Sequence, residues 1–415
     1  MTFINRLRFA FQQFQLTLFH LWESPFGSAL VAGIVYIELS AVTGALFSPS
    51  KNPYYNYLAD AFLHGQTWLR LIPPSTHDLI FFGGKYFLYW APFPALVVIP
   101  FIALFGVNFN DVIFTAIIAA LNVGLIAQLL RAAYQRGLLH ISKVQRGILV
   151  LFFAFGTVHL TLAPYGKVWS TGQLIGFTCT ILAYLAALSI QQTRAAWWWT
   201  GLALAAAMLT RINLVFTGIF PIIYLIYKEK PWDWSRVIKN FLLAALPIIT
   251  ASAFILLYNI ARFGGPFNFG LEYHLMDDLF KANFDRYGYF NISYAPVNIY
   301  YQYIFYPFPL RAQTKMGGSL FLLSPLFFGA FFSFKNSGSK WIPWVLLSSI
   351  LITNIPILLI MGTGWLQFGP RYTLDFTVPL LLLTALGIEK WKPSLLFILA
   401  LASIIQYSIG VFVIK

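Results

Sequence analysis

The chain has 415 residues, of which 59% are hydrophobic and only 10% are charged, whereas soluble domains carry about 25% charged residues. Apolar runs of about 20 residues, the length that crosses a hydrocarbon core, recur along the chain, and this excludes a soluble globular domain. The net charge of +14 does not indicate nucleic-acid binding, because Lys and Arg lie in short connections between apolar runs. The single cysteine, Cys179, provides neither a disulfide framework nor a Cys-based metal site.

The first segment, residues 1–23, is amphipathic. It lacks a compact apolar core and a small-residue cleavage site, so no cleavable signal peptide is expected. We expect instead an interfacial helix that lies on the membrane surface.

Hydropathy predicts about eleven or twelve membrane crossings in one transmembrane domain that covers residues 1–415. The predicted spans are residues 26–47, 112–130, 147–163, 169–189, 197–210, 214–227, 241–260, 319–333, 342–361, 374–388 and 395–414. No low-complexity linker divides them. The sequence therefore predicts an all-α, polytopic integral membrane protein.

A further apolar run, residues 92–106, has an irregular path within residues 88–107. Pro92, Pro94 and Pro100 each remove a backbone donor from it. A full crossing here would also move the basic loop at residues 131–146 to the outer side. We therefore expect a broken or re-entrant helix.

Lys and Arg gather in five of the short connections. They are Arg131, Arg136, Lys143 and Arg146; Arg194; Lys228, Lys230, Arg236 and Lys239; Lys335 and Lys340; and Lys390 and Lys392. Short cytoplasmic loops carry an excess of these residues, so all five connections are predicted to be cytoplasmic. Alternating crossings then place two long segments, residues 48–87 and 262–318, on the extracytoplasmic side.

The two outer segments differ in composition. The first predicts a helix over residues 54–64, followed by the breaker Pro73-Pro74 and a polar stretch with His77 and Asp78. The second, residues 262–318, is rich in Tyr, Phe, Gly and Pro, which suits a membrane interface.

Several short motifs follow one another along most of the chain. They are Tyr55-Asn56-Tyr57-Leu58-Ala59-Asp60-Ala61-Phe62-Leu63; Gly84-Lys85-Tyr86-Phe87 before Pro92-Phe93-Pro94; Leu209-Thr210-Arg211; Tyr258-Asn259-Ile260-Ala261-Arg262-Phe263-Gly264; and Phe368-Gly369-Pro370-Arg371-Tyr372. Their order resembles the GT-C superfamily of membrane glycosyltransferases, which includes protein O-mannosyltransferases and aminoarabinose transferases. The resemblance implies a GT-C-like fold with short extracytoplasmic juxtamembrane helices.

The resemblance also implies a chemistry. Such enzymes move a sugar from a polyprenyl-phosphate donor to a hydroxyl of an acceptor glycan, lipid or protein, commonly with an acidic general base in the first outer loop. Here the matching stretch is Ser50-Lys51-Asn52-Pro53, which holds no carboxylate, and Ala91-Pro92-Phe93 stands where the family has Lys-Pro-Pro. Either another residue is the base, or this member has altered or lost transferase activity.

Two aspartates are candidates for the base. Asp78 is preferred, because it lies beside His77 in a breaker-rich stretch; the alternative is an aspartate that only caps a helix after Pro73-Pro74. Asp60 lies in the predicted outer helix, where the alternative is a solvated polar face.

Three arginines are candidates for binding the donor phosphate, because a guanidinium group pairs with phosphate in a planar fork. Arg211 is the first choice, since it lies between two apolar runs with almost no loop, where an unpaired charge is costly. Arg371 and Arg262 are second choices, for which the alternative is anchoring to lipid headgroups.

Two further acidic residues need an explanation. Glu38 lies near the middle of the first predicted span, where an ionisable group is a functional candidate, and the alternative is a hydrogen bond to a polar neighbour. Asp375 follows Arg371 by four residues, so we expect these two side chains to pair across one helical turn.

A metal site is not predicted. Acidic residues in the second outer segment, with His274, could suggest a divalent cation, but their spacing fits no motif; they are Glu272, Asp277, Asp278 and Asp285. No cofactor is predicted, and a divalent metal is unsupported.

The combined prediction is a lipid-phosphate-dependent glycosyltransferase, and two rivals stay open. The first is a transporter or lipid-translocating protein, for which Glu38 and the interrupted spans would line a midplane site; such features do not recur in both halves of the chain. The second is a catalytically silent relative that binds a lipid-linked saccharide or scaffolds an assembly. Membrane lipids are expected partners, and the compact chain favours a bacterial inner membrane.

Overall fold

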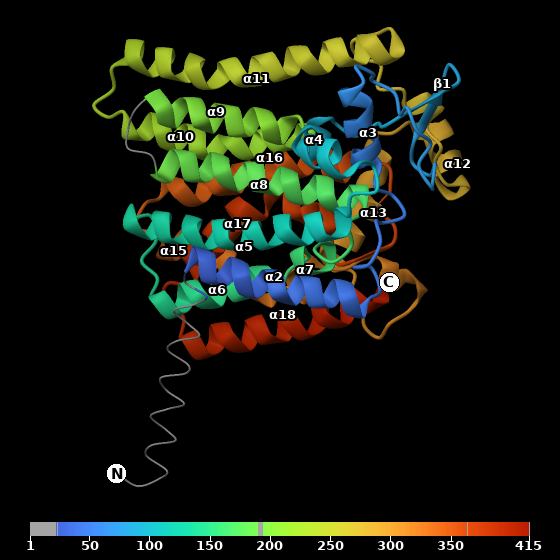
Figure 1. The fold of residues 1–415 in the computed structure, drawn as a ribbon. Helices are drawn as coiled ribbons and strands as arrows, with labels where there is room; N and C mark the ends of the chain where they lie inside the picture. The colour runs from blue at the N-terminus through green and yellow to red at the C-terminus, as the bar shows by residue number, and fades with distance from the viewer. Residues whose placement is uncertain (1–21, 23, 190–193, 363, 415) are drawn as a thin grey trace.

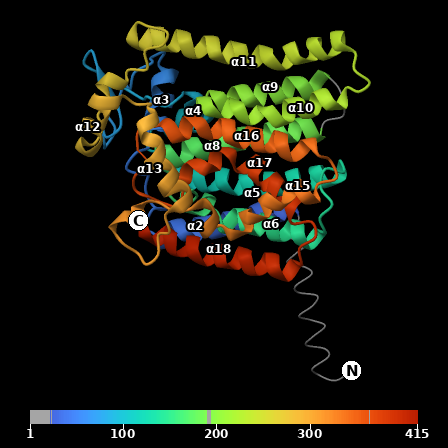
Figure 2. The same cartoon turned by 180° about the vertical axis from the view of Figure 1, so that it is seen from behind.

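The computed structural model describes residue 22 and residues 24–189, 194–362 and 364–414. Most of these residues are helical, and the described strands form two short pairs. The long helices run side by side along one direction, so the molecule is a bundle with two ends (Figures 1 and 2). The fold is all-α and polytopic, as predicted. The interfacial helix expected over residues 1–23 falls almost entirely outside the described residues.

Six described helices are long and apolar enough to cross a membrane. They are α2 (Pro25–Val42), α5 (Asp111–Gln135), α8 (Val168–Ser189), α11 (Trp234–Phe263), α16 (Trp341–Leu359) and α18 (Pro393–Val413). Each coincides with a predicted span. These helices support a membrane-embedded protein, because a helix satisfies its own backbone hydrogen bonds within lipid.

The remaining predicted spans are shorter or interrupted helices. They are α6 (Lys143–Phe155) with α7 (His159–Leu162); α9 (Arg194–Met208); η1 (Ile212–Gly218) with α10 (Ile219–Lys228); α14 (Leu320–Leu323), η6 (Pro325–Phe332) and α15 (Ser333–Asn336); and η7 (Arg371–Phe376) with α17 (Thr377–Gly387). Several of these spans contain 3₁₀ helices, namely η1, η6 and η7. A 3₁₀ helix has three residues per turn, so it changes which side chains share a face.

The helix α4 (Phe93–Phe105) has 13 residues, so it is only about 20 Å long. Its first N–H, on Phe93, donates to the Leu209 carbonyl. Beyond its last residue, the carbonyls of Val107 and Phe109 accept hydrogen bonds from the Asn56 side chain. The chain therefore enters and leaves α4 at the same end of the bundle, which agrees with the expected re-entrant path.

The two ends of the bundle carry different segments. At one end, here named the loop end, lie residues 43–92 and 264–319, which include α3 (Tyr54–Leu63), α12 (Asp278–Tyr287) and α13 (Ala295–Ile299) (Figure 1). The shorter elements of this end are β1 (Ile80–Phe82), β2 (Lys85–Phe87), η2 (Leu271–Tyr273), η3 (Ile292–Tyr294), η4 (Tyr300–Ile304), η5 (Ala312–Lys315) and β3 (Met316–Gly317). The turns α5–α6, α10–α11 and α17–α18 lie at the opposite, basic end (Figure 1).

Two backbone pairings join the two predicted outer segments, residues 48–87 and 262–318, to each other and to the bundle. Leu275 accepts from the Asp78 N–H at 3.0 Å and donates to Leu79 at 2.8 Å, and an antiparallel bridge pairs Ile80 with His274. The strand β3 pairs in parallel with β4 (Gln367–Phe368). Segments almost 200 residues apart in the sequence are therefore fixed against each other.

The centre of the bundle is α17, in which every residue is buried. Its run of leucines packs against η6 and α16 on either side of the chain. Close helix contacts elsewhere depend on small residues, as is usual between helices in membranes. On α9, a Cβ added at Gly201 would lie 2.1 Å from the Ala244 carbonyl oxygen of α11.

We predict that Gly201→Ala separates α9 from α11. Overpacking of this kind costs about 1 to 3 kcal/mol of folding free energy, so the midpoint of thermal unfolding in detergent should fall. The matched control is Gly338→Ala, because nothing lies within 4 Å of a Cβ at Gly338. Equal midpoints for the two variants would contradict the close α9–α11 contact.

Candidate functional site

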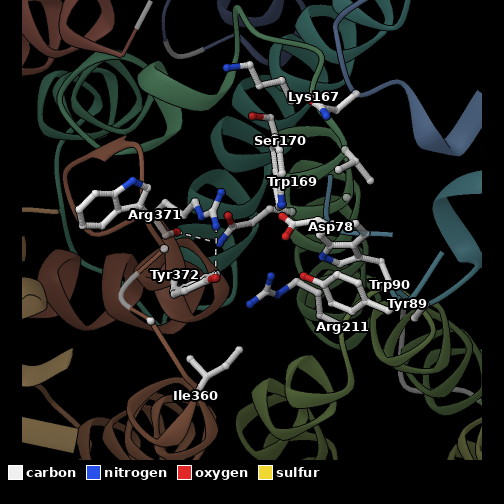
Figure 3. Close-up of a pocket in the computed structure, with 18 of the residues that line it drawn as sticks. Asp78, Tyr89, Trp90, Lys167, Trp169, Ser170, Arg211, Ile360, Arg371 and Tyr372 are labelled. Carbon is white, nitrogen blue, oxygen red and sulfur yellow. Dashed lines mark hydrogen bonds between the residues drawn. The ribbon is translucent and has the colours of Figure 1, made fainter. Parts of the chain in front are cut away.

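A cavity of about 830 Å³ opens at the loop end. Both outer segments line it, together with the loop-end termini of α8, α11, α16, η1 and η7. Figure 3 shows its central part, where side chains from these separate elements point toward a common space. Four of the six candidate site residues predicted from the sequence line this cavity: Asp78, Arg211, Arg262 and Arg371.

Asp78 is fixed at the cavity wall by the pairing of the outer segments. Its φ of +63° is a left-handed conformation, which is uncommon outside glycine and easiest for Asn and Asp. Its Oδ1 lies 3.4 Å from His274 Nε2 and 3.6 Å from His77 Nε2. Its Oδ2 makes no hydrogen bond within the described residues, and the side chain is 19% exposed. Asp78 therefore offers one carboxylate oxygen to the cavity.

His274 comes from the second outer segment and lies under this carboxylate. Its side chain is buried, and its ring stands edge-on to Tyr89 at 4.7 Å between centroids. Neither ring nitrogen makes a hydrogen bond within the described residues. His274 and His77 therefore flank the same oxygen of Asp78.

Arg211 is held by a buried carboxylate. Its Nε donates to Asp375 Oδ2 at 3.0 Å, and the Asn213 amide donates to the same oxygen at 2.7 Å. The Gln173 amide donates to Asp375 Oδ1 at 3.1 Å. Burial opposes the charge of Arg211, but the attraction of Asp375 raises the pKa of Arg211 above its ordinary value. The two Nη groups make no hydrogen bond within the described residues, so they are donors for a ligand.

The expected ion pair between Arg371 and Asp375 is wrong, because Asp375 pairs with Arg211. Residues 371–376 form the 3₁₀ helix η7 rather than an α-helix. With three residues per turn, a side chain four positions on is rotated by about 120° from the first. Asp375 therefore turns into the bundle while Arg371 turns into the cavity.

Arg371 has no acidic partner within the described residues. The Gln173 amide fixes its backbone by donating to its carbonyl at 2.7 Å. Its Nη2 donates to the Tyr372 hydroxyl at 3.2 Å, and its Nε is buried without a hydrogen-bond partner. Figure 3 places Arg371 across the cavity from Asp78.

Arg262 has a different role. Its Nη1 donates to the Leu88 carbonyl at 2.7 Å and its Nη2 donates to Asn259 at 2.8 Å, while its guanidinium lies 4.0 Å from the ring centre of Tyr258. These contacts tie the end of α11 to the chain that leads into α4. Arg262 lines the cavity, but its Nη1 serves this connection and its Nη2 is bound within α11, while its Nε is buried without a hydrogen-bond partner among the described residues.

Asp60 and Glu38 are not brought to the cavity. Asp60 accepts two hydrogen bonds from Arg70, each at 3.0 Å, in a bidentate ion pair at the other side of α3. Glu38 is exposed on α2 and lies four residues before that helix ends at Val42. It is therefore close to the loop end of the helix, not at its middle as the sequence indicated.

Two lysines at the cavity were not among the predicted site residues. Lys51 and Lys167 lie on neighbouring segments, because the Val168 N–H donates to the Asn52 carbonyl at 3.1 Å. Burial lowers the pKa of Lys167 below its ordinary value, and Lys51 and Arg371 lower it further. The available signal was the lone Lys167 in a very short turn between two apolar runs, and Lys51 in the stretch where the sequence resemblance implies an acidic residue.

The remaining walls are aromatic on one side and aliphatic on the other. Tyr89 and Trp90 have ring centroids 3.9 Å apart, and Trp169 stands edge-on to Trp90 at 6.1 Å. The aliphatic side is formed by α11, α16 and η1 and includes Ile255, Ile357 and Ile212. A ligand with a ring, an anion and an aliphatic part would find a matching surface for each.

The described residues contain no group of three or more His, Cys, Asp or Glu side chains that could hold a metal ion. The acidic residues of the second outer segment have local contacts. Asp277 caps α12 through the Leu279 N–H at 3.0 Å, and Asp285 lies 3.9 Å from Lys281.

Comparisons with known proteins give no relative. No family model matches this chain, and no curated protein and no solved structure matches it. The chemistry of the cavity is therefore argued from its own residues. It holds a carboxylate that can accept a proton and, opposite it, guanidinium groups that can bind an oxyanion.

We predict that Asp375→Asn destabilises the protein by about 3 kcal/mol, because it leaves the Arg211 charge unpaired in an apolar surrounding. The midpoint of thermal unfolding in detergent measures this change. Asp285→Asn is the matched control: its partner is 3.9 Å away and both side chains are mostly exposed, so its cost should stay below about 0.5 kcal/mol. Similar losses in both variants would contradict the role given to Asp375.

Proposed function

We propose that this protein is a membrane glycosyltransferase that moves a sugar from a polyprenyl-phosphate donor to an acceptor hydroxyl on the extracytoplasmic side. One observation carries the proposal. The free oxygen of Asp78 and the guanidinium groups of Arg211 and Arg371 face one another across a single cavity with aromatic and aliphatic walls (Figure 3).

The transfer step uses these groups in defined roles. The acceptor oxygen attacks the anomeric carbon of the sugar, and its proton passes to Asp78 Oδ2. The bond between this carbon and the phosphate oxygen breaks, and the polyprenyl phosphate leaves with the electron pair. Arg211 and Arg371 stabilise the negative charge that develops on the leaving phosphate, because preorganised donors act most strongly where charge forms.

The walls suit the rest of the donor. Flat rings such as Trp90 and Trp169 pack on the apolar face of a sugar, and the aliphatic side toward α11 and α16 accommodates a prenyl chain. Ile212 is 48% exposed and Phe216 39% exposed on this side. Such exposure is costly in water and is favourable against a lipid chain.

The distribution of Lys and Arg supports the proposed side. The turns at the basic end carry Lys and Arg, and short cytoplasmic loops are enriched in both. A multi-pass chain with its basic end in the cytoplasm has its cavity on the outer face, where lipid-linked sugars are used. We place it in the inner membrane of a bacterial cell.

The test is sugar transfer by the purified protein in nanodiscs, with a polyprenyl-phosphate donor that carries a labelled sugar and with release of polyprenyl phosphate as the readout. We expect Asp78→Asn to lower turnover by about 10²-fold or more, because the base is lost. Arg371→Gln should lower it as well. Binding of the donor to Asp78→Asn should persist.

Asp60→Asn provides the comparison between the two candidate bases. Asp60 lies outside the cavity, so turnover per folded molecule should stay close to that of the unchanged protein. Loss of transfer in Asp60→Asn with retention in Asp78→Asn would reverse the assignment. Donor binding without release of polyprenyl phosphate from any acceptor would favour a silent binding protein, and movement of the intact donor across the bilayer would favour a lipid translocator.

A further inference from the structure

The cavity carries more positive charge than one phosphate needs. Among the described residues that line it, five are Lys or Arg and two are Asp or Glu: Lys51, Lys167, Arg211, Arg262 and Arg371, with Asp78 and Asp277. Arg211 is neutralised by Asp375. Lys51, Lys167 and Arg371 have no carboxylate within ion-pair distance in the described part of the chain.

The two lysines are held in place by a rigid junction. The Ser50 N–H and hydroxyl donate to the Asp111 carboxylate at 2.7 Å and 2.6 Å. The same hydroxyl lies 3.2 Å from the Gly166 carbonyl. This network joins Ser50, which precedes Lys51, to Gly166, which precedes Lys167. The fold itself therefore brings the two lysines close together.

Such an arrangement opposes folding. Like charges repel, and the partial burial of Lys167 removes water that would screen its charge, whereas Lys51 is exposed. The direction of the Lys167 pKa shift agrees with this cost. Lys167 also directly precedes α8, whose N-terminus adds positive potential to the same corner. An oxyanion in this corner would remove the repulsion.

This corner is separate from Arg211. In Figure 3, Lys167 lies at the top of the view and Arg211 in its lower half, while Arg371 lies to the left at an intermediate height. The groups that act on the charge of Lys167 are Lys51 and Arg371, whereas those that act on Arg211 are Asp375, Tyr372 and Tyr289. Arg371 belongs to the Lys167 set by this measure, and the proposed transfer step uses it as well.

We propose that Lys51 and Lys167, together with Arg371, form a second anion site that binds an oxyanion group of a substrate, beside the phosphate position at Arg211. The identity of the substrate rests on the proposed function, but the site itself does not. The oxyanion has two possible sources: the second phosphate of a polyprenyl-diphosphate donor, or an acidic group on the acceptor.

The test is calorimetric titration of the full chain in detergent. Three probes are used: inorganic phosphate, farnesyl phosphate and farnesyl diphosphate. Removal of both lysines, in Lys51→Gln with Lys167→Gln, should weaken inorganic phosphate binding about tenfold or more, as expected when charge-assisted contacts are lost. The double Arg variant, Lys51→Arg with Lys167→Arg, should retain binding. Lys315→Gln is the matched control, because it removes an exposed charge at the same end outside the cavity.

The lipid probes identify the source. If the donor supplies the oxyanion, farnesyl diphosphate should bind about tenfold more tightly than farnesyl phosphate, and the double Gln variant should lose this preference. If the acceptor supplies it, the two lipids should bind alike, and inorganic phosphate should still bind when farnesyl phosphate saturates the protein.

The proposal is overturned if the double Gln variant binds every probe as the unchanged protein does, or if it loses binding no more than Lys315→Gln does. Unchanged midpoints of thermal unfolding show that the variants are folded. Phosphate binding that depends on the lysines, without any farnesyl phosphate binding, would contradict the proposed donor and leave the anion site standing.

Discussion

The site depends on the hydrogen bonds of the Asp375 carboxylate, because they join η7, η1 and α8 inside an apolar bundle. It accepts from Arg211, Asn213 and Gln173, which lie before η1, within η1 and in α8. A buried ion is stable only when its hydrogen-bonding capacity is filled, and here the partners come from segments far apart in the sequence. Gln173 also holds the backbone of Arg371. The buried pair of Arg211 and Asp375 thus positions the remaining donors of Arg211. Together with Gln173 it also fixes the first residues of η7, from which Arg371 reaches the cavity.

The opposite wall of the cavity depends on backbone pairing rather than on charge. Asp78 and Leu79 pair with Leu275, so the first outer segment cannot take its position without the second. The left-handed backbone of Asp78 is maintained by this pairing, and strain of this kind is often found at functional sites. The bundle supplies cations from its helix ends, and the outer segments supply the carboxylate and imidazoles. Function on this fold therefore requires both parts to be assembled.

Hydropathy was sufficient to predict the six long apolar helices, because lipid imposes strong constraints on length and composition. The placement of residues 48–87 and 262–318 on the extracytoplasmic side stays a prediction. The structure brings Asp78, Arg211 and Arg371 to one cavity, and each was a candidate from the sequence. Asp78 was chosen because it lies beside His77 in a breaker-rich stretch, and Arg211 because it is a charge between two apolar runs. The partners could not be found in the same way. Asp375 lies one α-helical turn from Arg371 in sequence, but the 3₁₀ geometry of η7 directs it to Arg211. The pairing of Asp60 with Arg70, and the approach of His274 to Asp78, depend on chain folding that no local pattern encodes.

The central claim is that the cavity faces outward and receives a lipid phosphate. It can be tested in intact cells with Cys179→Ala as background, by placing Ser75→Cys at the cavity and Ser337→Cys at the basic end. The measurement is labelling by a membrane-impermeant maleimide, with and without added short-chain polyprenyl phosphate. The account predicts that Ser75→Cys is labelled from outside and is protected by the lipid, whereas Ser337→Cys is labelled only after permeabilisation. Labelling of Ser75→Cys only after permeabilisation, or labelling that the lipid does not change, would contradict it.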